Sequence, residues 1–241
     1  MKRRIIAAVA VVAVWALVAS LSVPAAEETP TAPKAGKGGW IALFNGKNLE
    51  GWHPRPGKPP EKFSWIAKDG LLINEKNDAT DIISDVKLMD HELHIEFCCP
   101  PGGNSGVYLQ GRYEIQVGDS SRASKVNNTM CGAIYAKIAP KELVKVGEIT
   151  DETYNKETNW QKYDVKFWSA QLGPDGKVAE KARITVIHND KLIIDNAEID
   201  GVTGSAVDNK EGTPAGLMLQ GDHTRMKYRN ILHRPIKAEA K

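Results

Sequence analysis

The sequence predicts an all-β fold in which two antiparallel sheets pack face to face. Short runs from Trp40 onward alternate hydrophobic and polar residues with a period of two, as half-buried strands do. Glycine and proline, 21 and 13 residues in all, separate these runs, which is typical of turns between strands. The chain is 41% hydrophobic and 26% charged, a composition that excludes a fibrous or wholly disordered protein.

The expected strands follow from that alternation. Residues 91–97 place Leu93, Ile95 and Phe97 on one face, with Glu92, His94 and Glu96 on the other. Further strands are expected at residues 162–167, 183–188, 192–194, 216–220 and 226–231. Asn189 and Asp190 suit a tight turn between the second and third of these strands. We expect the last two strands to pair with each other.

One short helix is expected over residues 140–146, because Pro140 suits the first turn of a helix. Residues 147–159 are polar and are expected to form an excursion between strands. The tryptophans are expected mostly in the core. Trp52, beside His53, is the best candidate among them for a sugar-stacking platform.

The N-terminal residues are typical of a secretory signal. Three basic residues at positions 2–4 precede an apolar run over residues 5–19, and small residues around Pro24 fit a cleavage site. We therefore predict a signal peptide at 1–25, a flexible linker at 26–39, a folded domain at 40–236 and a tail at 237–241. The run is shorter than the roughly 20 residues needed to cross a membrane, so no span is expected after signal removal. The predicted location is periplasmic or extracellular.

Charge argues against nucleic acid as a partner. The formal net charge of +2 includes Lys2, Arg3 and Arg4 of the predicted leader, and without them the mature chain is near −1. A general polyanion binder needs a basic face. Three cysteines in an exported chain suggest one disulfide, in which Cys98 or Cys99 pairs with Cys131, leaving the third thiol buried.

The segment 104–119 carries the best candidates for chemistry. In a strand, Arg112, Glu114 and Gln116 project from one face while residues 113, 115 and 117 project into the core. A bulge at Gly118 would return Asp119 to the polar face. Such a row suits the recognition of hydroxyl groups and supplies two carboxylates for acid/base chemistry, although alternating polar residues are also usual on a solvated strand.

Three motifs resemble one family, the 3-keto-disaccharide hydrolase domain. They are residues 40–52, residues 104–106 with 113–116, and residues 219–223 with 228–231. The resemblance covers about residues 40–234 and implies a concanavalin A-like jelly-roll sandwich. It also implies chemistry on a glycoside whose C3 hydroxyl is oxidised to a ketone, which acidifies the C2 proton and permits elimination at C1. Gly221 departs from the more usual Leu-Gln-Asp-His order and can displace His223.

The resemblance suggests a role for each polar residue. Glu114 is the first choice for base or acid, with Asp119 as its partner. Arg112 and His223 are candidates for stabilising the developing oxyanion, and His223 can also carry the proton. The side chains expected to hold substrate hydroxyls are those of Asn104, Gln116, Gln220 and Tyr135.

The alternatives differ in chemistry. The same fold carries lectins, so a non-catalytic carbohydrate-binding module is the second hypothesis. A direct glucanase is disfavoured, because two of its three acidic strand positions are not matched. We expect a small saccharide or glycoside as substrate and no cofactor. Calcium is common in this class, but no loop has a convincing ligand spacing.

Overall fold

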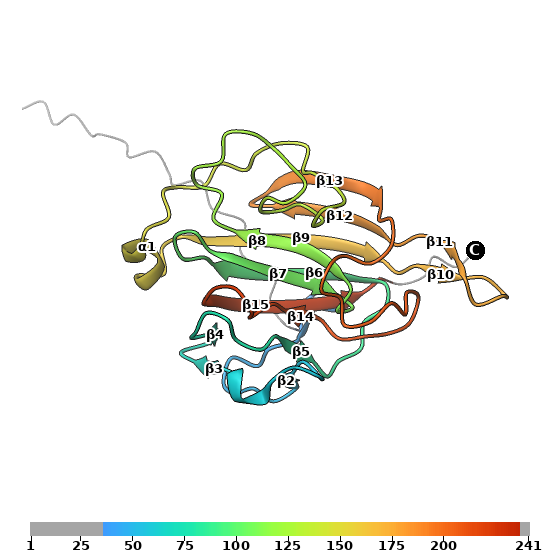
Figure 1. Ribbon diagram of the computed structural model, residues 1–241, viewed down its shortest axis with the longest axis horizontal. Helices are drawn as coiled ribbons and strands as arrows, with labels where there is room; N and C mark the ends of the chain where they lie inside the picture. Colours follow the sequence, from blue (N-terminus) through green and yellow to red (C-terminus); the bar gives the residue numbers. More distant parts are fainter. Residues whose placement is uncertain (1–35, 237–241) are drawn as a thin grey trace, which may run out of the picture. The chain divides into compact units, whose positions relative to one another are not determined.

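The computed structural model describes residues 36–236 as a sandwich of two antiparallel sheets (Figure 1). The larger sheet contains, in spatial order, β13 (Lys191–Glu198), β12 (Arg183–His188), β9 (Trp160–Trp168), β6 (His91–Cys98), β15 (Met226–Pro235), β4 (Leu71–Asn74) and β3 (Trp65–Lys68), and β1 (Ile41–Ala42) pairs with β15. The smaller sheet contains β2 (Trp52–Pro54), β5 (Ile82–Ser84), β14 (Met218–Leu219), β7 (Asn104–Leu109) and β8 (Tyr113–Gly118). β10 (Gln171–Leu172) and β11 (Val178–Glu180) form a separate hairpin. The predicted all-β jelly-roll sandwich is confirmed.

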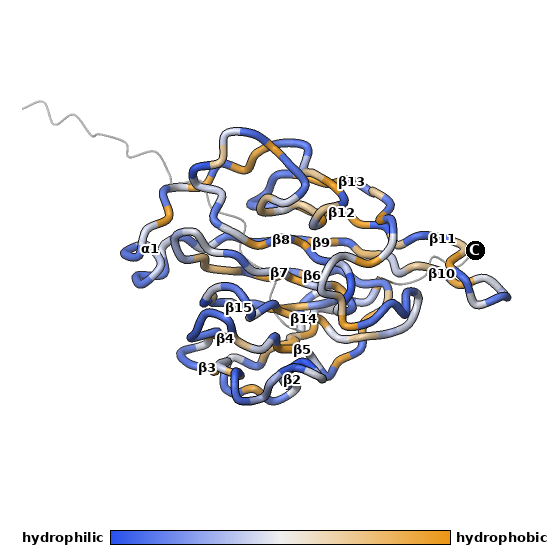
Figure 2. Tube along the Cα trace, viewed as in Figure 1, coloured by the Kyte–Doolittle hydropathy of each residue, from blue (hydrophilic) through white to orange (hydrophobic). Residues whose placement is uncertain are grey.

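The core lies between the two sheets and follows the predicted alternation. Leu93, Ile95 and Phe97 of β6 are fully buried, and they belong to one hydrophobic cluster with Val107 of β7 and Ile115 of β8. Figure 2 shows hydrophobic residues concentrated in the strands and hydrophilic residues in the outer loops. Burial of the inner faces of both sheets is therefore what holds the sandwich together.

The expected pairing of the last two strands is wrong. β14 pairs with β5 and β7 in the smaller sheet, whereas β15 pairs with β1, β4 and β6 in the larger one. The physical reason is burial on both faces: Leu217, Met218 and Leu219 are all inaccessible to solvent, which suits a central strand and not the partner of the half-exposed β15.

The expected helix at residues 140–146 is also wrong, because that segment has no helical hydrogen bonds. The α-helix is α1 (Asp151–Asn155), inside the predicted excursion, and a 3₁₀ turn covers Pro60–Lys62. Thr150 begins α1 with a capping box: its hydroxyl accepts from the Thr153 N–H, and the Thr153 hydroxyl accepts from the Thr150 N–H. A polar cap thus decides the helix position where the Pro140 signal fails.

The three cysteines are free and buried, so the predicted disulfide is wrong. The Cys98 thiol donates to Asn159 Oδ1 at 2.6 Å, and Cys131 Sγ lies 3.1 Å from the Tyr163 hydroxyl. Burial raises the pKa of Cys98 to about 11. Each thiol is therefore neutral and has its own polar neighbour in the interior.

The predicted signal peptide, the linker up to residue 35 and the tail at 237–241 lie outside the described residues, so these assignments stay predictions. Within residues 36–236, no helix has both the length and the apolar character that crossing a bilayer requires.

We expect Leu93→Ala to lower the free energy of unfolding by about 2–5 kcal/mol, because Leu93 is fully buried between the sheets. Leu192→Ala is the matched control in the same sheet, since that side chain is 43% exposed, and it should cost less than about 0.5 kcal/mol. Urea unfolding of both variants measures the difference. Equal losses would contradict this location of the core.

Candidate active site

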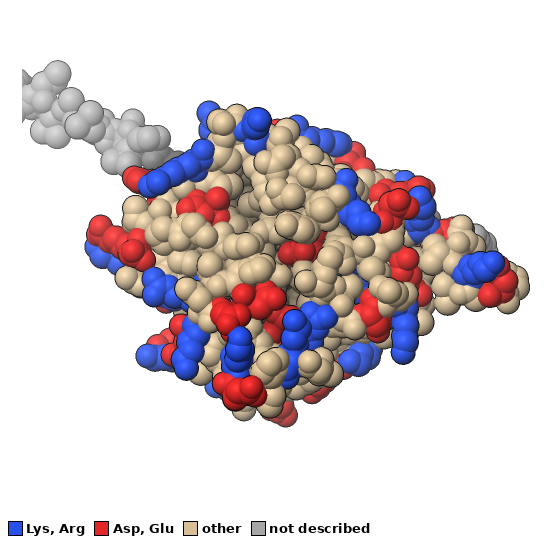
Figure 3. Space-filling view, viewed as in Figure 1, with Lys and Arg blue, Asp and Glu red and all other residues tan. Residues whose placement is uncertain are grey.

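The candidate active site lies on the face of the smaller sheet that points away from the core. Register places Tyr108 of β7 opposite Glu114 of β8, and Gly106 opposite Gln116. Met218 of β14 lies beside Tyr108, so Gln220, two residues later, belongs to the same face. Figure 3 shows that this face is hollowed and that acidic side chains gather there, with basic side chains beside them.

Glu114 is the central titratable group of this face. It is 4% exposed, and its Oε2 accepts a hydrogen bond from the Tyr108 hydroxyl at 2.8 Å. Burial raises the pKa of Glu114, the Tyr108 hydrogen bond lowers it, and the charges of Asp222 and Asp81 raise it, for a result of about 7. A carboxyl group with this pKa exchanges a proton readily at neutral pH, as acid/base catalysis requires.

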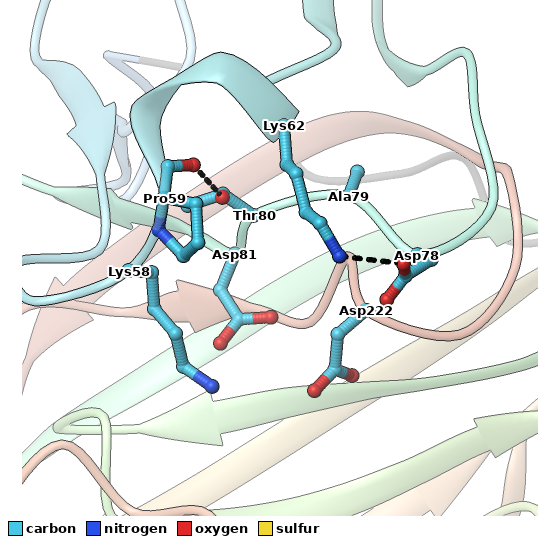
Figure 4. A pocket seen from close by; sticks show the side chains of 8 residues that line it. All are labelled: Lys58, Pro59, Lys62, Asp78, Ala79, Thr80, Asp81 and Asp222. Carbon is cyan, nitrogen blue, oxygen red and sulfur yellow. Dashed lines mark hydrogen bonds and ion pairs between the residues drawn. The ribbon is translucent and has the colours of Figure 1, made fainter.

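Asp81 and Asp222 complete what we call the acidic cluster, Glu114 with these two aspartates. Both line a pocket of about 140 Å³ together with Lys58 and Lys62 (Figure 4). Asp81 accepts from the Arg55 guanidinium at 3.1 Å and from the Gly221 N–H at 2.9 Å. The two aspartates of the acidic cluster therefore line a small, strongly polar hollow in which two ammonium groups offer hydrogen-bond donors, while Glu114 is not one of the lining residues.

Two buried polar atoms at the acidic cluster have no hydrogen-bond partner among the described residues. They are Oε1 of Gln220 and Oδ1 of Asp222. The amide group of Gln220 lies 3.5 Å from the Tyr108 hydroxyl, at the limit of a hydrogen bond. Because an unpaired buried acceptor costs free energy, both oxygens suit the hydroxyl groups of a bound ligand.

The structure does not bring the Arg112 guanidinium into this cluster. Arg112 is 1% exposed, and its Nε donates to Asp208 Oδ1 at 2.6 Å while Nη1 donates to the Thr213 carbonyl at 2.8 Å. Arg112 therefore anchors the segment around residues 208–213 to the start of β8. The expectation that it stabilises an oxyanion is not supported by this placement.

Asp119 also lies apart from Glu114. The β7–β8 register is continuous to Gly118, and the Asp119 N–H donates to the Gly103 carbonyl at 2.9 Å, so the expected bulge is wrong. Regular alternation then directs Asp119 to the opposite face. Its carboxylate accepts from the Ser121 hydroxyl at 2.6 Å and from the backbone N–H groups of Gly102 and Ser121. Burial raises its pKa, but these hydrogen bonds lower it more, so Asp119 stays ionised as a loop anchor.

The other predicted residues surround the acidic cluster. His223 is about half exposed at the rim, with Nδ1 3.7 Å from Asp222 Oδ1. Gln116 donates to Asn104 Oδ1 at 2.7 Å, so these two side chains pair on the outer face. The Tyr135 N–H donates to the Glu114 carbonyl at the edge of β8 that residues 132–135 cover, and the Tyr135 side chain is 36% exposed.

The sequence analysis did not predict Tyr108, Asp81 or Asp222, nor the two lysines of the pocket, Lys58 and Lys62. The alternation that selected Glu114 also places Tyr108 on the polar face, and Asp222 directly precedes the selected His223. Asp81 carried no such signal, because only the pairing of β5 with β14 brings it to the cluster.

The site has no evident metal centre. Among residues 36–236, no three histidine, cysteine or acidic side chains are arranged to hold a metal ion. His94, which the sequence sets near His91 and Glu92, instead contacts Asp164 at 2.6 Å on the larger sheet. The expectation that the protein needs no cofactor stays a prediction.

Comparison with known families agrees with this architecture. The 3-keto-alpha-glucoside-1,2-lyase-like domain matches residues 39–233. The chain belongs to this family. The resemblance seen in the three sequence motifs is therefore confirmed.

One curated relative, a 3-keto-disaccharide hydrolase from Bacteroides thetaiotaomicron, is 25% identical over 131 residues. That match covers 51% of this chain and 43% of the relative, so it spans less than half of the relative's length. Two crystal structures from Parabacteroides distasonis, both described as candidate glycosyl hydrolases, share the fold. The first has a TM-score of 0.66 and 24% sequence identity, and the match covers 83% of this chain and 84% of that one. The second has a TM-score of 0.58 and 16% identity, and the match covers 83% of this chain and 94% of that one. Together, the family and the fold indicate a carbohydrate-acting, hydrolase-type domain.

We expect Glu114→Gln to stabilise the protein at alkaline pH. The folded-state pKa of about 7 exceeds the ordinary value of 4.5, so the folded protein binds more protons in that window and loses stability as pH rises through it. The glutamine variant lacks this loss, which amounts to as much as about 3 kcal/mol. Urea unfolding at about pH 4 and about pH 8 measures it. A parallel pH dependence of wild type and variant would show that Glu114 titrates normally.

Proposed function

We propose that this protein cleaves 3-keto-glycosides by elimination followed by hydration. The observation that carries the proposal is the buried Glu114 carboxyl, which is bonded to Tyr108 and has a pKa of about 7 beside Asp81 and Asp222. A ketone at C3 acidifies the C2 proton, and a carboxylate of raised pKa is a suitable base for it. The name of the family, a 1,2-lyase-like domain, agrees with this reaction.

The proposed reaction balances without a redox partner. The Glu114 carboxylate removes the C2 proton, and the C–H electron pair forms an enolate with the C3 carbonyl. The enolate then expels the group at C1. The oxygen of this leaving group keeps the electron pair of the broken C1–O bond and takes a proton. Water adds to C1 of the resulting unsaturated ketone, and a proton returns to C2, which gives the free 3-keto sugar.

The surrounding residues have complementary roles in this proposal. Tyr108, whose pKa is raised by burial and by Glu114, stays protonated and orients the carboxylate. The ammonium groups of Lys58 and Lys62 line the pocket and offer positive charge to the enolate oxygen. His223, next to Asp222 at the solvent-exposed rim, is the residue that we propose carries the proton to the leaving oxygen.

The substrate is proposed to be a small saccharide derivative. A pocket of about 140 Å³ is well below the roughly 300–1,000 Å³ of sites for drug-sized ligands, so it suits one sugar ring or part of one. We also propose that the enzyme acts outside the cytoplasm, from the signal-like residues 1–25. The lectin-like alternative would be favoured by binding of a 3-keto-glycoside without release of the aglycone.

We expect Glu114→Gln to lower kcat on a 3-keto-glycoside by about 10²–10⁴-fold, because the amide cannot accept the C2 proton. Asp119→Asn is the matched carboxylate control and should retain kcat within about threefold, since Asp119 only holds a loop. Release of the aglycone measures both. Full activity of a folded Glu114→Gln variant would overturn the assignment of the base.

The pH profile gives an independent test. Because the base must be ionised, kcat/KM should fall as pH drops below about 7. We call this fall the acidic limb of the profile. Asp222→Asn removes a negative charge that raises the pKa of Glu114, so the acidic limb should move to lower pH, whatever the effect of the substitution on the maximal rate. Asp78→Asn is the control at the same pocket, because its carboxylate pairs with Lys62. A limb that stays in place in Asp222→Asn would contradict the acidic cluster.

A further inference from the structure

A second hollow is lined by residues of the larger sheet near α1 and the start of β9. Figure 1 shows where these two elements lie. Its volume is about 350 Å³, and it shares no lining residue with the pocket at the acidic cluster. The walls come from residues 145–149, from α1 and the residues after it, from β9 and from the β12–β13 turn. The proposed reaction uses none of these residues.

Gln161 at this hollow has an unsatisfied amide. Gln161 is only 4% exposed. Its Oε1 lies 2.8 Å from Nε2 of His188, and the amide Nε2 of Gln161 has no hydrogen-bond partner among the described residues. Burial lowers the pKa of His188 to about 4, so its imidazole is neutral. A single hydrogen bond therefore joins the imidazole and the Gln161 amide. In either amide orientation, one polar atom of Gln161 stays unpaired. A hydroxyl group both donates and accepts, so it satisfies either orientation.

A second amide and an indole complete the recognition surface. Asn189 Oδ1 accepts the Lys162 N–H at 2.9 Å, which leaves the Asn189 amide N–H groups to donate elsewhere. Trp160 lines the same hollow, and its ring orientation is held by the Arg229 guanidinium 3.9 Å from the ring centroid. Neutral amides beside an aromatic ring match a ligand with hydroxyl groups and an apolar C–H face.

The charges lining the hollow exclude a strongly charged ligand. Lys145 and Glu148 are the charged residues of this wall and have opposite signs, so the lining is neutral overall. An anion would meet one attractive and one repulsive group. A volume of about 350 Å³ lies at the lower end of ligand sites, enough for one or two sugar rings.

We propose that this hollow is a second, non-catalytic saccharide-binding site, which holds a neutral sugar unit through Trp160, Gln161 and Asn189. The inference stands on these residues alone and does not depend on the chemistry proposed at Glu114.

Calorimetric titration of the full chain with maltotriose, cellotriose and the acidic control trigalacturonate tests the proposal. We expect saturable binding of at least one neutral trisaccharide and no comparable binding of the acidic one. Trp160→Ala should weaken the binding by about tenfold or more, whereas Trp168→Ala, at the other end of β9, should change it by less than about twofold. Asp222→Asn should also retain the binding, because it alters only the first pocket.

Two further readouts separate this site from the catalytic one. Trp160→Ala should turn over a small 3-keto-glycoside at the wild-type rate, a result that is informative even if the Glu114 assignment fails. In wild-type protein, the indole N–H resonance of Trp160 should shift during the titration, which needs no variant to fold. Absence of saturable binding in the millimolar range, full binding by Trp160→Ala, or loss of binding in Asp222→Asn would each overturn the proposal.

Discussion

The register of β7 against β8 is the constraint on which the site depends. It sets Tyr108 opposite Glu114 and Gly106 opposite Gln116, while the alternate residues Val107 and Ile115 enter the core. A shift by one residue would move Glu114 into the apolar layer and expose Ile115. Gly106 is also required, because a Cβ at that position would collide with the Glu114 carboxyl. Core packing and the geometry of the candidate site are thus two results of one pairing.

The same environment raises the pKa of Glu114 and destabilises the folded state. Burial and two neighbouring carboxylates disfavour its ionised form, and like charges at such a place are costly unless other contacts hold them. Arg55 supports Asp81 and reaches the carbonyls of Ser205 and Ala206, while Arg112 ties Asp208 to the start of β8. Ionic anchors therefore hold the loops around a group whose own charge is disfavoured.

Each of the two sites that we propose is associated with a different sheet. The smaller sheet turns its outer face into the acidic cluster, whereas the larger sheet supplies, at the end near α1, the hollow lined by Trp160 and Gln161. At the first site Glu114 alternates with core residues along β8, whereas Gln161 of the second site lies on the same buried face of β9 as Tyr163. The two sites are separate because one lies at the outer face of the smaller sheet and the other at the end of the larger sheet near α1.

The sequence by itself determined the all-β class, the longer strands and the alternation along β6 and β8, because these follow from local periodicity. The choice of Glu114 rested on that alternation together with the family resemblance. Tertiary structure alone decided that β14 and β15 join different sheets, that Arg112 and Asp119 anchor loops, and that Asp81 reaches Glu114. A period of two assigns a residue to a face, but it does not say which strand or loop lies across from that face. Strand partners distant in sequence settle that, through burial and hydrogen bonding that no local pattern encodes.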